Sequence, residues 1–204
     1  MGKLQRSAIY KGFKKDLMEK YGVQMAEAIW KVADERLQEL EAAYPELSRD
    51  SKMMILPAAA IYQALQENVE EELLEEAFQL LKDYGTKLGT KIAECIHAFT
   101  SIPVLSAMLW KNAPALMRKM SSEEAGYTRE IVSENSELVG VDILSCPLHD
   151  AAVKIGMPRV AQIVCAMDKA YMTGFKYIKY TRTTSVAEGD RCCDYRLSFD
   201  KSKK

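Results

Sequence analysis

The sequence has no apolar run of about 18 residues, the length that a helix needs to cross a bilayer. Its polar start, residues 1–6, is not followed by the apolar stretch of a secretory signal. It has no paired Cys-x-x-Cys knuckles of the kind that hold structural zinc, no internal repeat and no low-complexity segment. We therefore expect a protein of the cytoplasm that has no membrane partner.

An excess of charge of one sign is also missing. The 204 residues include 28 Lys and Arg against 29 Asp and Glu, which leaves a formal net charge of −1. No global field would attract nucleic acid, so we expect no nucleic-acid partner. Hydrophobic residues make up 48% of the chain and charged residues 28%, which is typical of a globular protein with a packed core.

The chain has five cysteines, an odd number that does not suit a disulfide framework. In a reducing compartment such thiols serve as core residues, metal ligands or nucleophiles. Four of the five lie in the last third of the sequence, interleaved with acids, one histidine and an arginine. Any chemistry is therefore expected there, and the rest of the chain is expected to be mainly helical scaffold.

The first 120 residues show helical periodicity. Apolar residues recur every three or four positions, which predicts amphipathic helices over about residues 7–44 with a break near Gly22, and from Ser51 onward. A further helix follows the acidic run at residues 70–72, since acids favour helix starts. The apolar segment 102–120 predicts core helices.

From about residue 125 the pattern changes to period two. We predict strands over 127–133, 139–143, 176–186 and 193–199, with a helix from Pro158 to Tyr171. The fold class is α+β: an N-terminal helical portion packed with a C-terminal antiparallel β-sheet and an intervening helix. We expect a helical extension over 1–48 and an α+β domain over 49–204, or one continuous domain. A homodimer and a monomer both fit the amphipathic helices.

Several chemically capable side chains fall at suggestive places. Cys165 and Asp168 are three apart on the predicted helix and so share a face. Cys146 sits where a strand ends, His149 follows it, and Cys193 opens the last strand. Each of these thiols also fits a small buried core residue. Other residues are given structural roles: Cys95 and Cys192 in packing, His97 at a helix surface, and Gly189 with Asp190 in a hairpin turn first and an active-site loop second.

Taken in order, these residues carry a resemblance. Cys146-Pro147, the Cys165-Ala-Met-Asp168 block, Arg182-Thr183 and the Gly189-Asp190 to Cys193-Asp194-Tyr195 ending together resemble the L-2-amino-thiazoline-4-carboxylic acid hydrolase family. The helix block 56–65 is also similar to the N-terminal helix of that family. The resemblance covers about residues 50–200, and Cys192 is not part of the pattern.

The resemblance implies a hydrolase that opens a small cyclic amidine or thiazoline by adding water to the ring carbon, giving S-carbamoyl-cysteine. It implies Arg182 as the anchor of the substrate carboxylate and Asp168 as the partner of the amidine nitrogens, with His149 and Asp190 beside the substrate. Cys146 or Cys165 would act as an activated thiolate. The alternative is a divalent metal, zinc or manganese, held by Cys146, Cys165, Cys193 and His149.

Two other function classes fit the same sequence. One is a small-ligand sensing domain similar to vinyl-reductase-like domains, with an apolar cavity lined by Met108, Trp110 and Met117 and no catalysis. The other is an accessory protein that keeps the fold and presents an apolar surface patch. Catalysis predicts instead that Cys165, Asp168 and Arg182 converge on one cavity.

Overall fold

The structure, a computed structural model, describes residues 2–200 and has the predicted α+β fold. The chain divides into two compact units. Unit 1 contains residues up to 85 together with 151–164, and unit 2 contains 86–150 together with 165 onward. The predicted domain boundary between residues 48 and 49 stays a prediction.

Unit 1 is built from helices. Its first four helices are α1 (Lys3–Arg6), α2 (Phe13–Tyr21), α3 (Val23–Ala43) and α4 (Arg49–Asn68). The short 3-10 helix η1 (Glu71–Leu73) leads into α5 (Leu74–Thr100), and η3 (Pro158–Val160) leads into α8 (Ala161–Met172). The break predicted near Gly22 is confirmed, because this residue separates α2 from α3 with φ +79°, a conformation that favours glycine. The predicted first helix starts later than residue 7, since residues 7–12 form turns.

The helices of unit 1 bury their predicted apolar stripes. Ser48 caps α4 by accepting a hydrogen bond from the backbone N–H of Ser51, as expected for a serine before a helix. The largest fully buried side chains of this unit are Tyr10, Phe13, Phe78, Leu4, Leu17, Ile29, Ile55, Leu56, Ile61, Leu65, Leu81 and Ile163.

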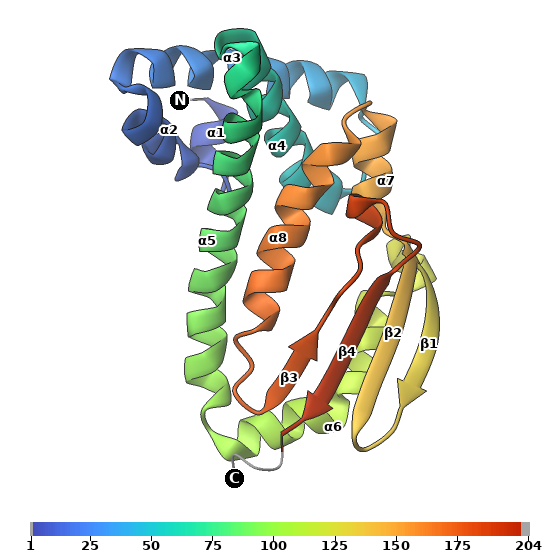
Figure 1. Ribbon diagram of the computed structural model, residues 1–204. Coiled ribbons are helices and arrows are strands. Elements are labelled where there is room, and N and C mark those ends of the chain that lie inside the picture. Colours follow the sequence, from blue (N-terminus) through green and yellow to red (C-terminus); the bar gives the residue numbers. More distant parts are fainter. Residues whose placement is uncertain (1, 201–204) are drawn as a thin grey trace. The chain divides into compact units, whose positions relative to one another are not determined.

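Unit 2 is built around a four-stranded antiparallel sheet in the order β1-β2-β4-β3 (Figure 1). The strands are β1 (Thr128–Glu134), β2 (Leu138–Ser145), β3 (Ile178–Thr181) and β4 (Cys193–Phe199). Because side chains alternate between the faces of a sheet, the register fixes which residues share a face. Three of the aligned pairs on the inner face are Ile143 with Cys193, Val141 with Tyr195, and Tyr180 with Leu197.

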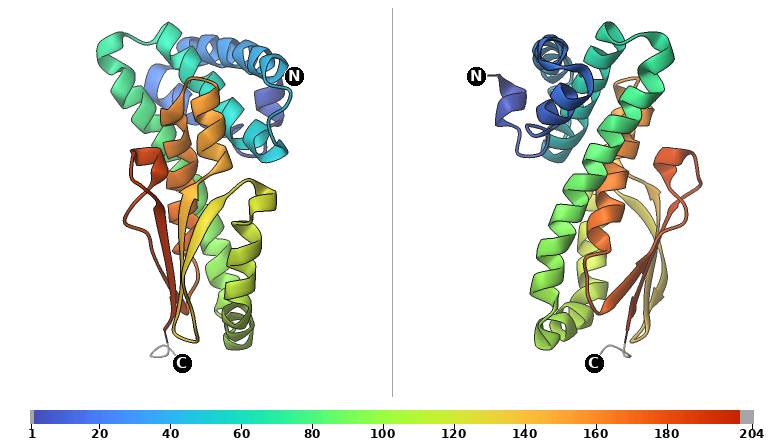
Figure 2. Two further views of the ribbon diagram at one scale, coloured as in Figure 1. Left: turned by 90° about the vertical axis from the view of Figure 1, so that its right-hand side faces the viewer. Right: turned by 60° about the vertical axis from the view of Figure 1, so that its left-hand side comes forward.

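The inner face of the sheet is covered by helices of the same unit. Ala113 of α6 (Pro103–Met120) and Met172 of α8 pack with Val139, Ile178 and Leu197 in one apolar cluster. Figure 2 shows α6 running beside the sheet. The cluster holds the C-terminal half of α8 against the sheet, which positions the side chains of that half.

Two segments differ from the sequence prediction. Residues 147–154 form a helix, α7 (Pro147–Lys154), where only the end of a strand was predicted. The predicted strand over 176–186 is reduced to the four residues of β3, and Val186–Glu188 forms the 3-10 helix η4. The strand ends early because the backbone N–H groups of Thr183 and Thr184 bond to the side chain of Asp194 and not to a neighbouring strand.

Among residues 2–200, no helix is by itself long and apolar enough to meet the criterion for a membrane span. One bent pair of helical segments, Glu71–Thr100 with Pro103–Met120, meets the criterion when the two are taken together.

Candidate functional site

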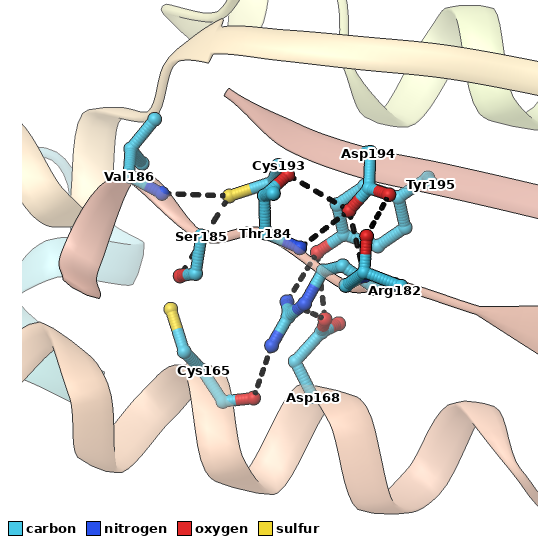
Figure 3. A network of polar contacts seen from close by, with 10 residues as sticks. Cys165, Asp168, Arg182, Thr184, Ser185, Val186, Cys193, Asp194 and Tyr195 are labelled. Atoms are coloured by element: carbon cyan, nitrogen blue, oxygen red, sulfur yellow. Dashed lines mark hydrogen bonds and ion pairs between the residues drawn. The ribbon is translucent and has the colours of Figure 1, made fainter. Parts of the chain in front are cut away.

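Three segments of unit 2 bring polar side chains together. Helix α8 supplies Cys165 and Asp168, the loop after β3 supplies Arg182, and β4 supplies Cys193 and Tyr195 (Figure 3). In this view Cys165 and Asp168 project from one side of the helix toward the loop and the strand. Cys165, Asp168 and Arg182 are therefore close together in the fold, and the cavity expected at these residues stays a prediction.

Arg182 is the centre of the network. Its Nη1 donates to Oδ2 of Asp168 over 2.9 Å and to the hydroxyl of Tyr195 over 3.0 Å. Its Nη2 donates to the carbonyl oxygen of Cys165 over 3.0 Å. Only 5% of the Arg182 side chain is exposed. A guanidinium keeps its proton, so burial of this charge requires a paired anion, which Asp168 provides.

Asp168 receives hydrogen bonds from phenols as well as from Arg182. The Tyr195 hydroxyl donates to Asp168 Oδ2 over 2.6 Å, and the hydroxyl of Tyr171 also bonds to this carboxylate. Burial raises the pKa values of both phenols, and the negative charge of Asp168 adds to the effect. The phenols are thus neutral donors, and they fix the orientation of a carboxylate that remains 23% exposed.

Asp194 holds the loop that carries Arg182. Its carboxylate accepts from the backbone N–H groups of Thr183 and Thr184, over 2.7 Å each, and from both threonine hydroxyls, over 2.6 and 2.9 Å. Burial alone would raise the pKa of Asp194, but these hydrogen bonds lower it well below its usual range. The loop is therefore fixed by a charged side chain of the adjacent strand.

Burial keeps the three candidate thiols protonated. It raises the pKa of Cys165 to about 12, although Arg182 and the hydroxyl of Ser185 oppose the rise. Burial also raises the pKa of Cys146. It raises the pKa of Cys193 as well, although a hydrogen bond from the backbone N–H of Val186, at 3.3 Å, opposes that rise. A thiolate is the nucleophilic form, and burial disfavours it at all three positions.

The predicted site residues do not all join the network. Cys146 packs beside Cys193 in an apolar cluster and accepts from the first backbone N–H groups of α7. The Nδ1 atom of His149 lies 3.9 Å from Asp150, and the exposed Asp190 accepts from the backbone N–H of Ser185 over 2.8 Å. Within the described structure, Asp190 thus shapes a turn.

Sequence reasoning missed the phenols of the network. The alternation of Tyr195 with Cys193 along β4, and the helical periodicity of Tyr171 along α8, both indicate core positions and give no sign of a polar role. Their spacing could have shown the shared role: Tyr171 follows Asp168 by three residues, one helical turn. Cys95 and His97 are exposed on α5, as expected for His97.

The metal-site and sensing-domain alternatives each require a different set of side chains to lie together. In residues 2–200 no cluster of three or more His, Cys, Asp and Glu side chains has an arrangement that could hold a metal ion. Of the three residues expected to line a sensor cavity, Met108 is 57% exposed, whereas Trp110 and Met117 are partly buried and pack against the same apolar cluster.

Comparison with known proteins gives a family but no close relative. No curated protein matches the chain. Among solved structures, an H-NOX protein from K. algicida is 12% identical, with a TM-score of 0.37 over 98% of this chain and 97% of that one. An H-NOX mutant from S. oneidensis is 13% identical, with a TM-score of 0.36 over 94% of each chain. Scores this low support no functional argument.

A sequence family does match the chain. Residues 48–197 match the sequence pattern of the L-2-amino-thiazoline-4-carboxylic acid hydrolases. The matched range includes every residue of the Arg182 network and the thiols of Cys146, Cys165 and Cys193. The chain therefore belongs to the L-2-amino-thiazoline-4-carboxylic acid hydrolase family.

Proposed function

We propose that this protein hydrolyses a C–N bond in a small cyclic amidine or thiazoline. The observation that carries the proposal is the Asp168–Arg182 ion pair, next to the Cys165 thiol and largely shielded from water. The namesake substrate of the family has an amidine-like group and a carboxylate. A carboxylate and a guanidinium are the complementary partners of these two groups.

In the free protein the two charges satisfy each other. A ligand that carries both an amidinium and a carboxylate can replace these contacts in kind, with the ring nitrogens on Asp168 and the carboxylate on Arg182. After this exchange each of the two charges still has a partner of opposite sign, which binding at a buried site requires. A ligand with only one of the two groups would leave either Asp168 or Arg182 without an oppositely charged partner.

The proposed reaction uses Asp168 as a base and Cys165 as an acid. Asp168 accepts one proton from water as the water oxygen bonds to the ring carbon. The bond from that carbon to the ring nitrogen then breaks, and the second water proton passes from the new hydroxyl to this nitrogen, which leaves a carbonyl group. The Cys165 thiol gives its proton to the departing nitrogen. Transfer of the proton from Asp168 to the Cys165 sulfur restores both groups, so that one water is consumed and the product is S-carbamoyl-cysteine.

The raised pKa of Cys165 favours this assignment over a thiolate nucleophile. A thiol with a pKa of about 12 keeps its proton at neutral pH and can donate it. Covalent attack by sulfur would first require loss of that proton against the effect of burial. The proposal also uses no metal ion, and elemental analysis of protein purified without added metal tests that choice against the zinc or manganese alternative.

The direct test is turnover of L-2-amino-thiazoline-4-carboxylate, with S-carbamoyl-cysteine measured by mass spectrometry. Wild-type protein should form product, and Asp168→Asn should lower kcat by about 10²- to 10⁴-fold, the usual contribution of a general base. Glu67→Gln, an exposed carboxylate in unit 1, is the control and should leave turnover unchanged. Absence of product with wild-type protein would overturn the proposal, and a covalent adduct on Cys165 would replace the acid role with a nucleophilic one.

A further inference from the structure

Tyr180 lies at the edge of the network with its hydroxyl unused. It is paired with Leu197 in the β3–β4 register, and Arg182 follows two residues later, at the same face of the sheet. The Tyr180 ring packs against that of Tyr195, with centroids 5.8 Å apart. Its hydroxyl oxygen is buried and has no hydrogen-bond partner within residues 2–200.

An unused buried hydroxyl is unusual, because burial of a polar group without a partner is costly. The two neighbouring phenols differ from Tyr180 in this respect, since the hydroxyls of Tyr171 and Tyr195 both bond to Asp168. Two phenols therefore bond to the carboxylate of the ion pair, whereas the third packs on Tyr195 and has no partner for its hydroxyl among residues 2–200. Such a hydroxyl can donate a hydrogen bond to a ligand that enters the site.

The charges around Tyr180 indicate the kind of partner. Burial raises the pKa of Tyr180, and the charge of Asp168 raises it further while Arg182 opposes the rise. The hydroxyl is therefore a neutral donor, and the rings of Tyr180 and Arg182's partner Tyr195 pack together. A neutral donor and a guanidinium that share this neighbour suit an anionic acceptor with several lone pairs, and a carboxylate is the smallest common group of that kind.

We propose that the Tyr180 hydroxyl is a substrate-binding group that donates a hydrogen bond to the ligand carboxylate held by Arg182. This inference rests on the proposed function and adds a residue to it. Tyr180 makes the site select cyclic amidines that carry a carboxylate over the same ring without one. A site that leaves a buried donor unpaired rejects the ligand that cannot satisfy it.

The test compares Tyr180→Phe with a matched control, Tyr21→Phe. Tyr21 is a residue of unit 1, and its hydroxyl is likewise buried without a partner among the described residues, so both variants lose the same kind of atom. The full-length proteins are assayed with L-2-amino-thiazoline-4-carboxylate and with 2-amino-2-thiazoline, which lacks the carboxylate. Dissociation constants are measured by calorimetry, and kcat and KM by product formation.

We expect Tyr180→Phe to weaken binding of the carboxylated compound by about 10- to 100-fold, the contribution of a hydrogen bond to a charged group. Binding of 2-amino-2-thiazoline should not change, and Tyr21→Phe should match wild type with both compounds. Thermal stability of Tyr180→Phe should equal or exceed that of wild type, since no existing hydrogen bond is lost.

Three results would overturn the inference. The first is equal affinity of Tyr180→Phe and wild type for the carboxylated compound. The second is an equal loss of affinity for both compounds, and the third is a lowered melting temperature, each of which shows a structural role for the hydroxyl. If wild-type protein binds and converts neither compound, the proposed function itself fails. An active wild type with an unaltered Tyr180→Phe variant refutes the role of Tyr180 alone.

Discussion

Arg182 and Asp168 form an ion pair over 2.9 Å in which the cation is the more deeply buried partner, with 5% of its side chain exposed against 23% for the anion. Breaking a buried pair from either side leaves a charge without compensation, which costs more than the pair itself contributes. This asymmetry makes the pair a structural element of unit 2, and under the proposed function only a ligand with matching charges would replace its contacts.

Removal of the anion should destabilise the protein more than removal of the cation. Asp168→Asn leaves the buried guanidinium unpaired and should lower the free energy of unfolding by about 3 kcal/mol. The double variant, Arg182→Met with Asp168→Asn, should lose less than the sum of the two single variants. Urea unfolding of the three variants measures both effects. Glu67→Gln, which breaks an exposed pair with Arg36, should change the free energy of unfolding by less than about 1 kcal/mol. Additive costs at 168 and 182 would contradict the coupling.

The thiols should differ in reactivity according to burial. Cys95 is exposed on α5 and should be alkylated first by iodoacetamide in native protein at pH 7.5, whereas Cys146, Cys165 and Cys193 should react at least about 10-fold more slowly, since both burial and protonation oppose attack. Peptide mass spectrometry over time gives the order of labelling. Rapid labelling of Cys165 would show a thiolate and would remove the acid role proposed for it.

Burial of Cys165 should also make stability fall at alkaline pH. The folded-state pKa of about 12 lies above the value of about 8.5 for an unfolded chain, so the folded state binds the proton more tightly. The stabilisation is complete below about pH 8.5 and is lost as pH rises toward 12. Urea unfolding at pH 8, 9 and 9.5 should show a smaller decrease for Cys165→Ser, which does not titrate there. Equal slopes for the two proteins would indicate an exposed thiol.

How far the sequence predicts the site depends on the range of the interaction. Local periodicity predicts β2, β4 and α8, and the spacing of three between Cys165 and Asp168 places both on one helix face. It does not predict that β3 ends at Thr181, because the side chain of Asp194 on another strand takes the N–H groups that a longer strand would use. The unused hydroxyl of Tyr180 is likewise invisible in sequence, since it depends on which neighbours tertiary packing provides.

Asp194 should stabilise the fold in a pH-dependent way. Its hydrogen bonds to Thr183 and Thr184 hold its pKa below the usual range, so its contribution is present above about pH 4 and is lost as pH falls further. Asp194→Asn should cost about 1–2 kcal/mol at pH 7 and flatten the decline in stability between pH 5 and about 2.5. It should also lower turnover, since the loop that carries Arg182 loosens. A variant that keeps both the acid decline and full turnover would contradict this role.

The last prediction concerns the contact that seats α8 in unit 2. Gly89 of α5 faces this helix so closely that an added Cβ would lie 2.3 Å from the backbone oxygen of Met167, the residue before Asp168. Alanine gains about 1 kcal/mol in helix propensity over glycine, but a backbone clash costs more, so Gly89→Ala should destabilise by about 2 kcal/mol and displace Asp168, lowering turnover. Gly156→Ala is the control: φ is +74° with open space around it, so it should cost about 1 kcal/mol by strain alone and leave turnover intact. A stabilised Gly89→Ala variant would show that α8 does not make this contact.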